Sequence, residues 1–150
     1  MRLLADVNSL AILLVQDHPG NDGVTTELAP ALRGEDTLVT FGYAPLRVQW
    51  LLTNEFGIDQ DRAEHAVKGL LDQPIDFTQI QKDVVQDAYQ IAEYNGHDVY
   101  DCYYIAAARS ANVDKIISTD TDFRGLCDDE DFHYLQPVSD EVLAEFESYS

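Results

Sequence analysis

The sequence predicts an α/β protein, a three-layer α/β/α sandwich around a mostly parallel central sheet. Short apolar runs of strand length alternate with longer segments whose apolar residues recur at helical spacing. That alternation is typical of parallel strands joined by helices, which cover the sheet on both faces. With 150 residues, 45% of them hydrophobic, the chain has the usual size of one domain. We therefore expect a single domain over residues 1–150.

The first half of the chain begins with a strand pattern followed by a helix pattern. The run RLLADV at 2–7 is short and apolar, as in a buried strand, and the segment after it has helical spacing behind a capping Asn8 or Ser9. Residues 18–23 (HPGNDG) predict a loop, and a short helix follows that Gly34 ends. The run DTLVTF then predicts a second strand, which leads into a helix containing YAPLRVQWLL at 43–52.

The second half continues the alternation. Residues 59–72 and 76–94 have the pattern of two amphipathic helices, separated by a turn at Gln73 and Pro74. The stretch NGHD interrupts the helical spacing before an apolar helix at 99–112. DKIIST at 114–119 predicts a buried strand, HYLQPV a last short strand, and SDEVLAEFESY a closing acidic helix.

The composition is strongly acidic. Asp and Glu number 28 against 9 Lys and Arg, which gives a formal charge of −19 and no basic surface for nucleic acid. Lys occurs only at 68, 82 and 115, a pattern that also suits a cytosol of molar salt, where the Debye length is about 3 Å and repulsion is screened. The acidity therefore predicts a halophilic protein and leaves local chemistry to identify the partner.

The cysteines and the apolar runs bear on the compartment. Cys102 and Cys127 form no ligand-spaced pair and no disulfide scaffold. The longest apolar run, LAILLV at 10–15, is too short to span a bilayer, and the N-terminus lacks the layout of a signal peptide. We expect a soluble, cytoplasmic protein without a membrane partner.

Several acids stand where a site is expected. In parallel α/β sheets, sites lie beyond the carboxyl ends of the strands, and Asp6 and Asp120 each follow a predicted strand. Asp101 shares an otherwise apolar helical face with Tyr104 and Ile105. Converging carboxylates raise one another's pKa unless a cation neutralises them, and carboxylate oxygens suit Mg²⁺ or Mn²⁺. Any one of these acids alone is more simply a cap or loop residue; for Asp98 and Asp122 we prefer that interpretation.

Four segments in order carry a resemblance to a known family. They are DVNSL at 6–10, LRVQWLL at 46–52, YDCYYIAAA at 100–108 and STDTDF at 118–123. Together they resemble the PIN-domain nucleases and, within them, the VapC-type ribonuclease toxins. The resemblance implies a PIN-like fold over most of the chain, and the acidic composition adds a halophilic archaeon as the predicted source.

The resemblance also implies roles for individual residues. Asp6, Asp101 and Asp120 would be the first, third and fourth metal-binding acids, and Asp122 an auxiliary one. Asn8 and Ser118 match the polar residues that accompany them. The implied activity is Mg²⁺- or Mn²⁺-dependent hydrolysis of RNA phosphodiester bonds by a metal-activated water. The family further suggests a homodimer and a small antitoxin protein that blocks the site.

Arg47 departs from the family pattern, because it stands where the second acid is expected. Glu55 is a poor substitute, since eight residues along a helix is about 12 Å. Turned into the cluster, the guanidinium would leave three carboxylates with a formal charge of −2, which balances one divalent ion. Alternatively, it pairs bidentately with two acids and replaces the metal, or its stem packs while its head reaches solvent. The sequence thus predicts a ribonuclease that is weakened if Arg47 enters the site, with a catalytically silent RNA- or protein-binding domain as the alternative.

Other chemistries find little support in the sequence. The four histidines are scattered, without HExxH or CxxC, so a zinc site is not expected. The motifs GxSxG, GxGxxG and Walker A are missing, and the DTD at 120–122 lies too near the C-terminus for an aspartate-nucleophile phosphatase. Trp50 and the tyrosines are interpreted as core residues and not as base-stacking platforms.

Overall fold

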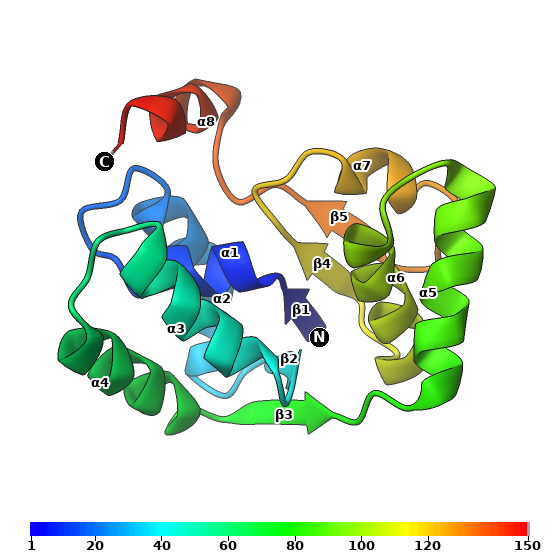
Figure 1. The fold of residues 1–150 in the computed structure, drawn as a ribbon, viewed down its shortest axis with the longest axis horizontal. Coiled ribbons are helices and arrows are strands. Elements are labelled where there is room, and N and C mark those ends of the chain that lie inside the picture. The colour runs from blue at the N-terminus through cyan, green and yellow to red at the C-terminus, as the bar shows by residue number, and fades with distance from the viewer. Residues whose placement is uncertain (150) are drawn as a thin grey trace.

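The computed structural model describes residues 1–149, and at its centre lies a parallel sheet of five strands (Figure 1). The strand order is β3-β2-β1-β4-β5, and every neighbouring pair is parallel. The strands are β1 Arg2–Ala5, β2 Thr37–Phe41, β3 Ile75–Thr78, β4 Lys115–Ile117 and β5 His133–Leu135. The predicted fold class, with a mostly parallel sheet, is confirmed.

Helices cover both faces of the sheet, as alternating residues of β1 demonstrate. Leu3 belongs to a core cluster with residues of the first four helices, whereas Leu4 packs with residues of the next three. The first group is α1 Val7–Leu13, α2 Asn21–Leu32, α3 Ala44–Asn54 and α4 Gln60–Leu71. The second group is α5 Lys82–Asn95, α6 Val99–Ala111 and α7 Phe123–Leu126. Two buried cores on opposite faces make the three layers of the predicted sandwich.

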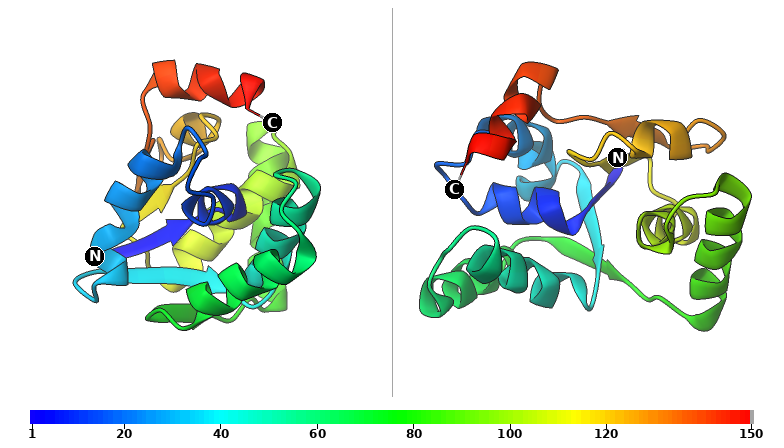
Figure 2. Two further views of the ribbon diagram at one scale, coloured as in Figure 1. Left: turned by 90° about the vertical axis from the view of Figure 1, so that its left-hand side faces the viewer. Right: turned by 45° about the horizontal axis from the view of Figure 1, so that its top comes forward.

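The C-terminal segment packs beside the first group of helices (Figure 2). It consists of α8 Asp140–Glu145 and the short 3₁₀ helix η1 Phe146–Ser148, so the predicted closing acidic helix is two shorter pieces. Phe146 and Tyr149 pack against the buried ring of His18, with centroid distances of 4.6 and 4.7 Å. Within residues 1–149, every helix is too short or too polar to cross a lipid bilayer.

The start of α1 differs from the prediction in a way that concerns the site. Asp6, and not Asn8 or Ser9, is the N-cap, because its Oδ1 accepts a hydrogen bond of 2.9 Å from the Ser9 amide. The cap explains why the chain turns into a helix immediately after β1. It also fixes the carboxylate at the carboxyl end of that strand.

Three further boundaries differ from the sequence prediction. Residues 75–78 form the edge strand β3, which pairs with β2, although helical spacing predicts a helix from residue 76 onward. Helix α2 begins at Asn21, inside the predicted loop, where the side-chain amide of Asn21 donates to the carbonyls of Ile12 and Leu13 at the end of α1. The short helix α7 was not predicted. The first two differences arise from contacts between separate segments, which local spacing does not encode.

Candidate functional site

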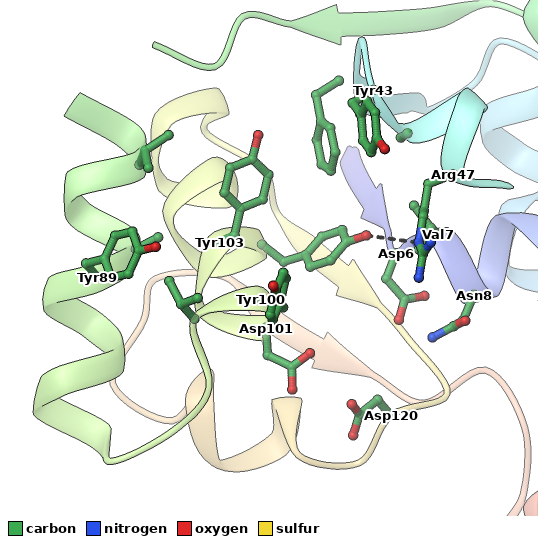
Figure 3. Close-up of a pocket in the computed structure, with 16 residues that line it drawn as sticks. Asp6, Val7, Asn8, Tyr43, Arg47, Tyr89, Tyr100, Asp101, Tyr103 and Asp120 are labelled. Atoms are coloured by element: carbon green, nitrogen blue, oxygen red, sulfur yellow. Dashed lines mark hydrogen bonds between the residues drawn. The ribbon is translucent and has the colours of Figure 1, made fainter. Parts of the chain in front are cut away.

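A cavity of about 850 Å³ opens where the carboxyl ends of the strands meet the starts of α1, α3 and α6. Its lining includes Asp6, Asn8, Arg47, Asp101 and Asp120. Figure 3 shows the carboxylates of Asp6, Asp101 and Asp120 facing a common space, from the end of β1, from α6 and from the segment after β4. The topology therefore brings together the acids that the sequence placed at the strand ends.

Asp6 is the most buried of these acids, with 3% of its surface exposed. Besides the cap hydrogen bond from Ser9, its Oδ2 accepts a hydrogen bond of 2.6 Å from the hydroxyl of the fully buried Ser118. Burial raises the pKa of the Asp6 carboxyl, and the hydrogen bonds from Ser118 and Ser9 oppose that rise. The two hydrogen bonds thus hold the carboxylate in one orientation, and burial removes most of the water that would otherwise solvate it.

Ser118 also positions Asp120. The Asp120 amide donates to the Ser118 hydroxyl over 2.9 Å, so one buried oxygen ties both strand-end acids together. The negative charge of Asp120 in turn contributes to the raised pKa of Asp6. Ser118, which the sequence suggested as a polar companion, is a linker between two acids, whereas the other suggested companion, Asn8, lies exposed on the cavity wall.

Asp101, Asp120 and Asp122 form an acidic cluster. Each offers a carboxylate oxygen, and these oxygens lie within 4.8 Å of one another. Asp122 is an exposed turn residue before α7 whose side chain makes no capping hydrogen bond, so of the two alternatives, cap or loop residue, the structure shows the loop residue. Asp98, in contrast, is confirmed as the N-cap of α6 through its bond to the Asp101 amide. An oxygen-only cluster of this kind has the donors that a hard divalent cation prefers.

His97 belongs to the site although the sequence interpretation set the histidines aside. Its Nε2 lies 2.8 Å from Oδ2 of Asp101 and 3.4 Å from Oδ2 of Asp98. The hydrogen bond to Asp101 raises the pKa of His97, while burial raises the pKa of Asp101. The sequence does contain a signal for this contact: His97 and Asp101 are four residues apart at a helix start that Asp98 caps, a spacing that places their side chains side by side.

We expect the pair to be visible in a titration of the metal-free protein. Because the folded-state pKa of His97 is raised above 6.5, its protonated form stabilises the fold fully below that value, and the contribution is lost as pH rises through the raised pKa. NMR of the imidazole should show Asp101→Asn bringing the pKa of His97 down toward 6.5. His97→Gln, which assigns the signal, should lower the free energy of unfolding by about 1 kcal/mol or less at acid pH. An unchanged pKa in Asp101→Asn would contradict the pairing.

Arg47 lines the cavity but pairs with none of its acids. Its guanidinium carbon lies 4.1 Å from the centroid of the Trp50 ring, one turn along α3. Among the ion pairs within residues 1–149 none involves Arg47, so the interpretation in which it bridges two acids and replaces a metal is wrong. Packing along an aromatic ring with an exposed head is what the structure shows, and this leaves the carboxylates free to bind a cation.

Aromatic residues form much of the remaining wall. Phe41, Tyr103 and Tyr104 pack against one another, with ring centroids 5.3 to 6.4 Å apart. The Tyr104 hydroxyl accepts a hydrogen bond of 3.1 Å from the Val7 amide, next to Asp6. These residues fit the core interpretation. The core interpretation is wrong for Trp50 and for four tyrosines that are exposed, namely Tyr43, Tyr89, Tyr94 and Tyr100.

Comparison with known proteins agrees with this architecture. The solved structure of VapC20 from Mycobacterium tuberculosis, described as a sarcin-ricin loop cleaving toxin, superposes with a TM-score of 0.63 at 14% sequence identity. The match covers 82% of this chain and 93% of that one. No curated protein matches by sequence. The PIN domain profile matches residues 10–128, which include Asp101 and Asp120 and begin just after Asp6. The chain belongs to the PIN domain family.

Proposed function

We propose that the protein is a metal-dependent endoribonuclease of toxin–antitoxin type, which hydrolyses phosphodiester bonds of RNA. Two observations of the acids carry the proposal. Carboxylate oxygens of Asp101, Asp120 and Asp122 lie within 4.8 Å of one another. Asp6, Asp101 and Asp120 line one cavity. Membership of the PIN family and the likeness to a toxin that cleaves the sarcin-ricin loop support it.

The donor set fits Mg²⁺ or Mn²⁺, because it offers carboxylate oxygens and no thiolate. Asp6, Asp101 and Asp120 would hold the ion, with Asp122 as an auxiliary ligand. When bound, such an ion supplies an activated water and neutralises charge on the phosphate. The raised pKa values of Asp6 and Asp101 fit this role, since a cation would favour the ionised form of both.

The other residues of the cavity would position the acids and the substrate. Ser118 orients Asp6 and Asp120 through its hydroxyl. Asn8 offers an amide beside Asp6, and Arg47 offers a cation to a phosphate of the bound strand. None of these three needs to exchange a proton in the reaction.

A second candidate function is a PIN-like domain that binds RNA or protein without cutting. It is favoured by Arg47, which puts a positive charge where the family pattern has an acid. We further propose a homodimer, a small antitoxin as partner, a cytoplasmic location, adaptation to high salt and a single domain over residues 1–150.

The test is cleavage of structured RNA in molar salt with Mn²⁺. We expect the wild-type chain to cut, EDTA to stop the reaction, and Asp101→Asn to slow it by about 100-fold or more, because it removes a charged ligand. Asp128→Asn, which changes an exposed acid outside the cavity lining and outside both acid groups at the site, is the matched control and should retain most of the activity. Binding of RNA without any cleavage in Mn²⁺ would favour the silent domain instead.

A further inference from the structure

Three tyrosines line the cavity with most of their surface exposed. Tyr43 is 69%, Tyr89 62% and Tyr100 80% exposed. They come from separate places in the chain: Tyr43 precedes α3, Tyr89 lies on α5 and Tyr100 lies on α6 beside Asp101. Figure 3 shows Tyr43 above Arg47 and Tyr89 on the opposite wall. The cavity that holds Asp101 and Asp120 is thus also lined by rings that the fold itself does not bury.

The three rings take no part in the aromatic pairs found within residues 1–149. Other aromatic residues of the same wall pair with one another, but Tyr43, Tyr89 and Tyr100 stack on no aromatic ring within residues 1–149. Large apolar surfaces left exposed around one cavity are typical of a binding site. Their flat faces are therefore free to receive a ligand.

The charges around the cavity limit what the ligand can be. Arg47 is the one cation in its lining within the described residues, against Asp6, Asp101 and Asp120. Other arginines are engaged elsewhere, as in the pairs of Arg2 with Asp76 and of Arg109 with Glu130. Duplex RNA presents its phosphates and hides the faces of its bases, and its binding draws on many cations. An unpaired strand also presents base faces, and stacking of these faces on aromatic rings contributes affinity that does not itself depend on positive charge.

We propose that Tyr43, Tyr89 and Tyr100 are base-stacking residues that select an unpaired RNA strand for the acid cluster. The proposal rests on the proposed function in taking RNA as the substrate. Because Tyr100 is adjacent to Asp101, a base stacked on it keeps its own phosphate near the carboxylates. Arg47, one turn from Tyr43, contacts a phosphate of the same strand. In this proposal the bases of the RNA strand are bound by stacking on the tyrosines, and Arg47 is the one cation that contacts its phosphate backbone.

The test is binding of a short fluorescent single-stranded RNA to the full chain, with Ca²⁺ present to neutralise the carboxylates. The RNA is checked to be intact after each titration. Each of Tyr43→Ala, Tyr89→Ala and Tyr100→Ala should weaken binding about 5- to 150-fold, the range of one base–aromatic stack, while the corresponding changes to Phe should keep it. Tyr94→Ala is the control: Tyr94 is 86% exposed and lies on the same helix as Tyr89, but outside the cavity lining.

Two further comparisons sharpen the test. A blunt duplex that contains the same strand should bind at least about tenfold more weakly, because its bases are not available for stacking. Between about 0.1 M and about 1 M salt, affinity for the single strand should fall by no more than about fivefold, since a single phosphate contact gives a slope near −0.7. A fall of about a thousandfold, or equal binding of the duplex, overturns the proposal.

The remaining outcomes separate this inference from the proposed function. Tyrosine-dependent binding without cleavage in Mn²⁺ supports the inference and contradicts the nuclease. Cleavage by wild type and all three alanine variants with equal binding overturns the inference and leaves the nuclease standing. If the alanine variants instead lose self-association in sedimentation and keep RNA affinity, the rings form a protein interface and the inference is wrong.

Discussion

Replacing Arg47 by Glu should raise the affinity for Mn²⁺, and the rate of cleavage at saturating RNA, each by about tenfold or more, while RNA itself binds more weakly because the proposed phosphate contact of Arg47 is lost. In the wild type, the carboxylates of Asp6, Asp101 and Asp120 together with one guanidinium carry a formal charge of −2; with glutamate the charge becomes −4. A divalent ion is attracted more strongly by the second arrangement, although solvent screens part of the gain because Arg47 is exposed. Manganese binding is measured by calorimetry and cleavage with structured RNA in molar salt.

Two variants serve as controls for this result. Arg47→Gln removes the charge and keeps a polar side chain of similar reach, so its affinity for Mn²⁺ should lie between those of the wild type and Arg47→Glu. Adding Asp6→Asn to Arg47→Glu should remove the gain and slow cleavage by about 100-fold or more, because a buried ligand is lost. If the wild type already cuts fully and Arg47→Glu gives no gain, position 47 does not correspond to the second acid of the family.

Loss of the contact between Arg47 and Trp50 is a separate effect of the same change. A cation over an exposed ring contributes about 0.5–1 kcal/mol, so Arg47→Glu and Arg47→Gln should be less stable than the wild type by similar amounts. Chemical denaturation measures this difference without reference to activity. If Arg47→Glu cleaves RNA faster although it is slightly less stable, the change in charge and not a change in stability is the cause of the faster cleavage.

The elements that position the site were predictable because each depends on neighbouring residues. Strand β1 is a short apolar run that ends just before Asp6, and β4 ends three residues before Asp120. Because the two strands are parallel, Asp6 and Asp120 had to lie at the same edge of the sheet. Asp101 stands out as a carboxylate on an apolar helical face. These features are local patterns, and the fold confirms their placement.

What the sequence did not reveal depends on contacts between distant segments. The bond of Ser118 to Asp6 joins residues 112 positions apart, and β3 is a strand only because β2 offers it an edge. The exposure of Tyr43, Tyr89 and Tyr100 is decided by how α3, α5 and α6 surround the cavity. The spacing of aromatic residues alone cannot separate a buried ring from one that faces a ligand.

Replacing Asp6 by Asn should make the metal-free protein more stable at neutral pH, by about 1 kcal/mol, or about 2–4 °C in melting temperature. Asp6 is 3% exposed, and burial raises the pKa of its carboxyl above 3.8, so its ionised form opposes folding. Asparagine can accept the hydrogen bond from the Ser9 amide and donate to the Ser118 hydroxyl oxygen, which also accepts from the Asp120 amide. The Ser118 proton then loses Asp6 as its acceptor, which offsets part of the gain. The geometry is kept, and the buried charge is removed.

The pH dependence and the metal distinguish this explanation from a general packing effect. The advantage of Asp6→Asn should be full above the raised pKa of Asp6 and disappear as pH falls toward 3.8, because the wild-type carboxyl then takes up a proton. Saturating Mn²⁺ should reverse the order, since it stabilises the wild type by about 2.7 kcal/mol at 100 times its Kd and the variant far less. Asp120→Asn, at a half-buried position, should gain little stability without metal. A lower melting temperature for Asp6→Asn across the whole pH range would contradict this explanation. It would show that the ionised carboxylate stabilises the fold as a helix cap, and that the protein loses no stability by keeping a metal-binding acid at this position.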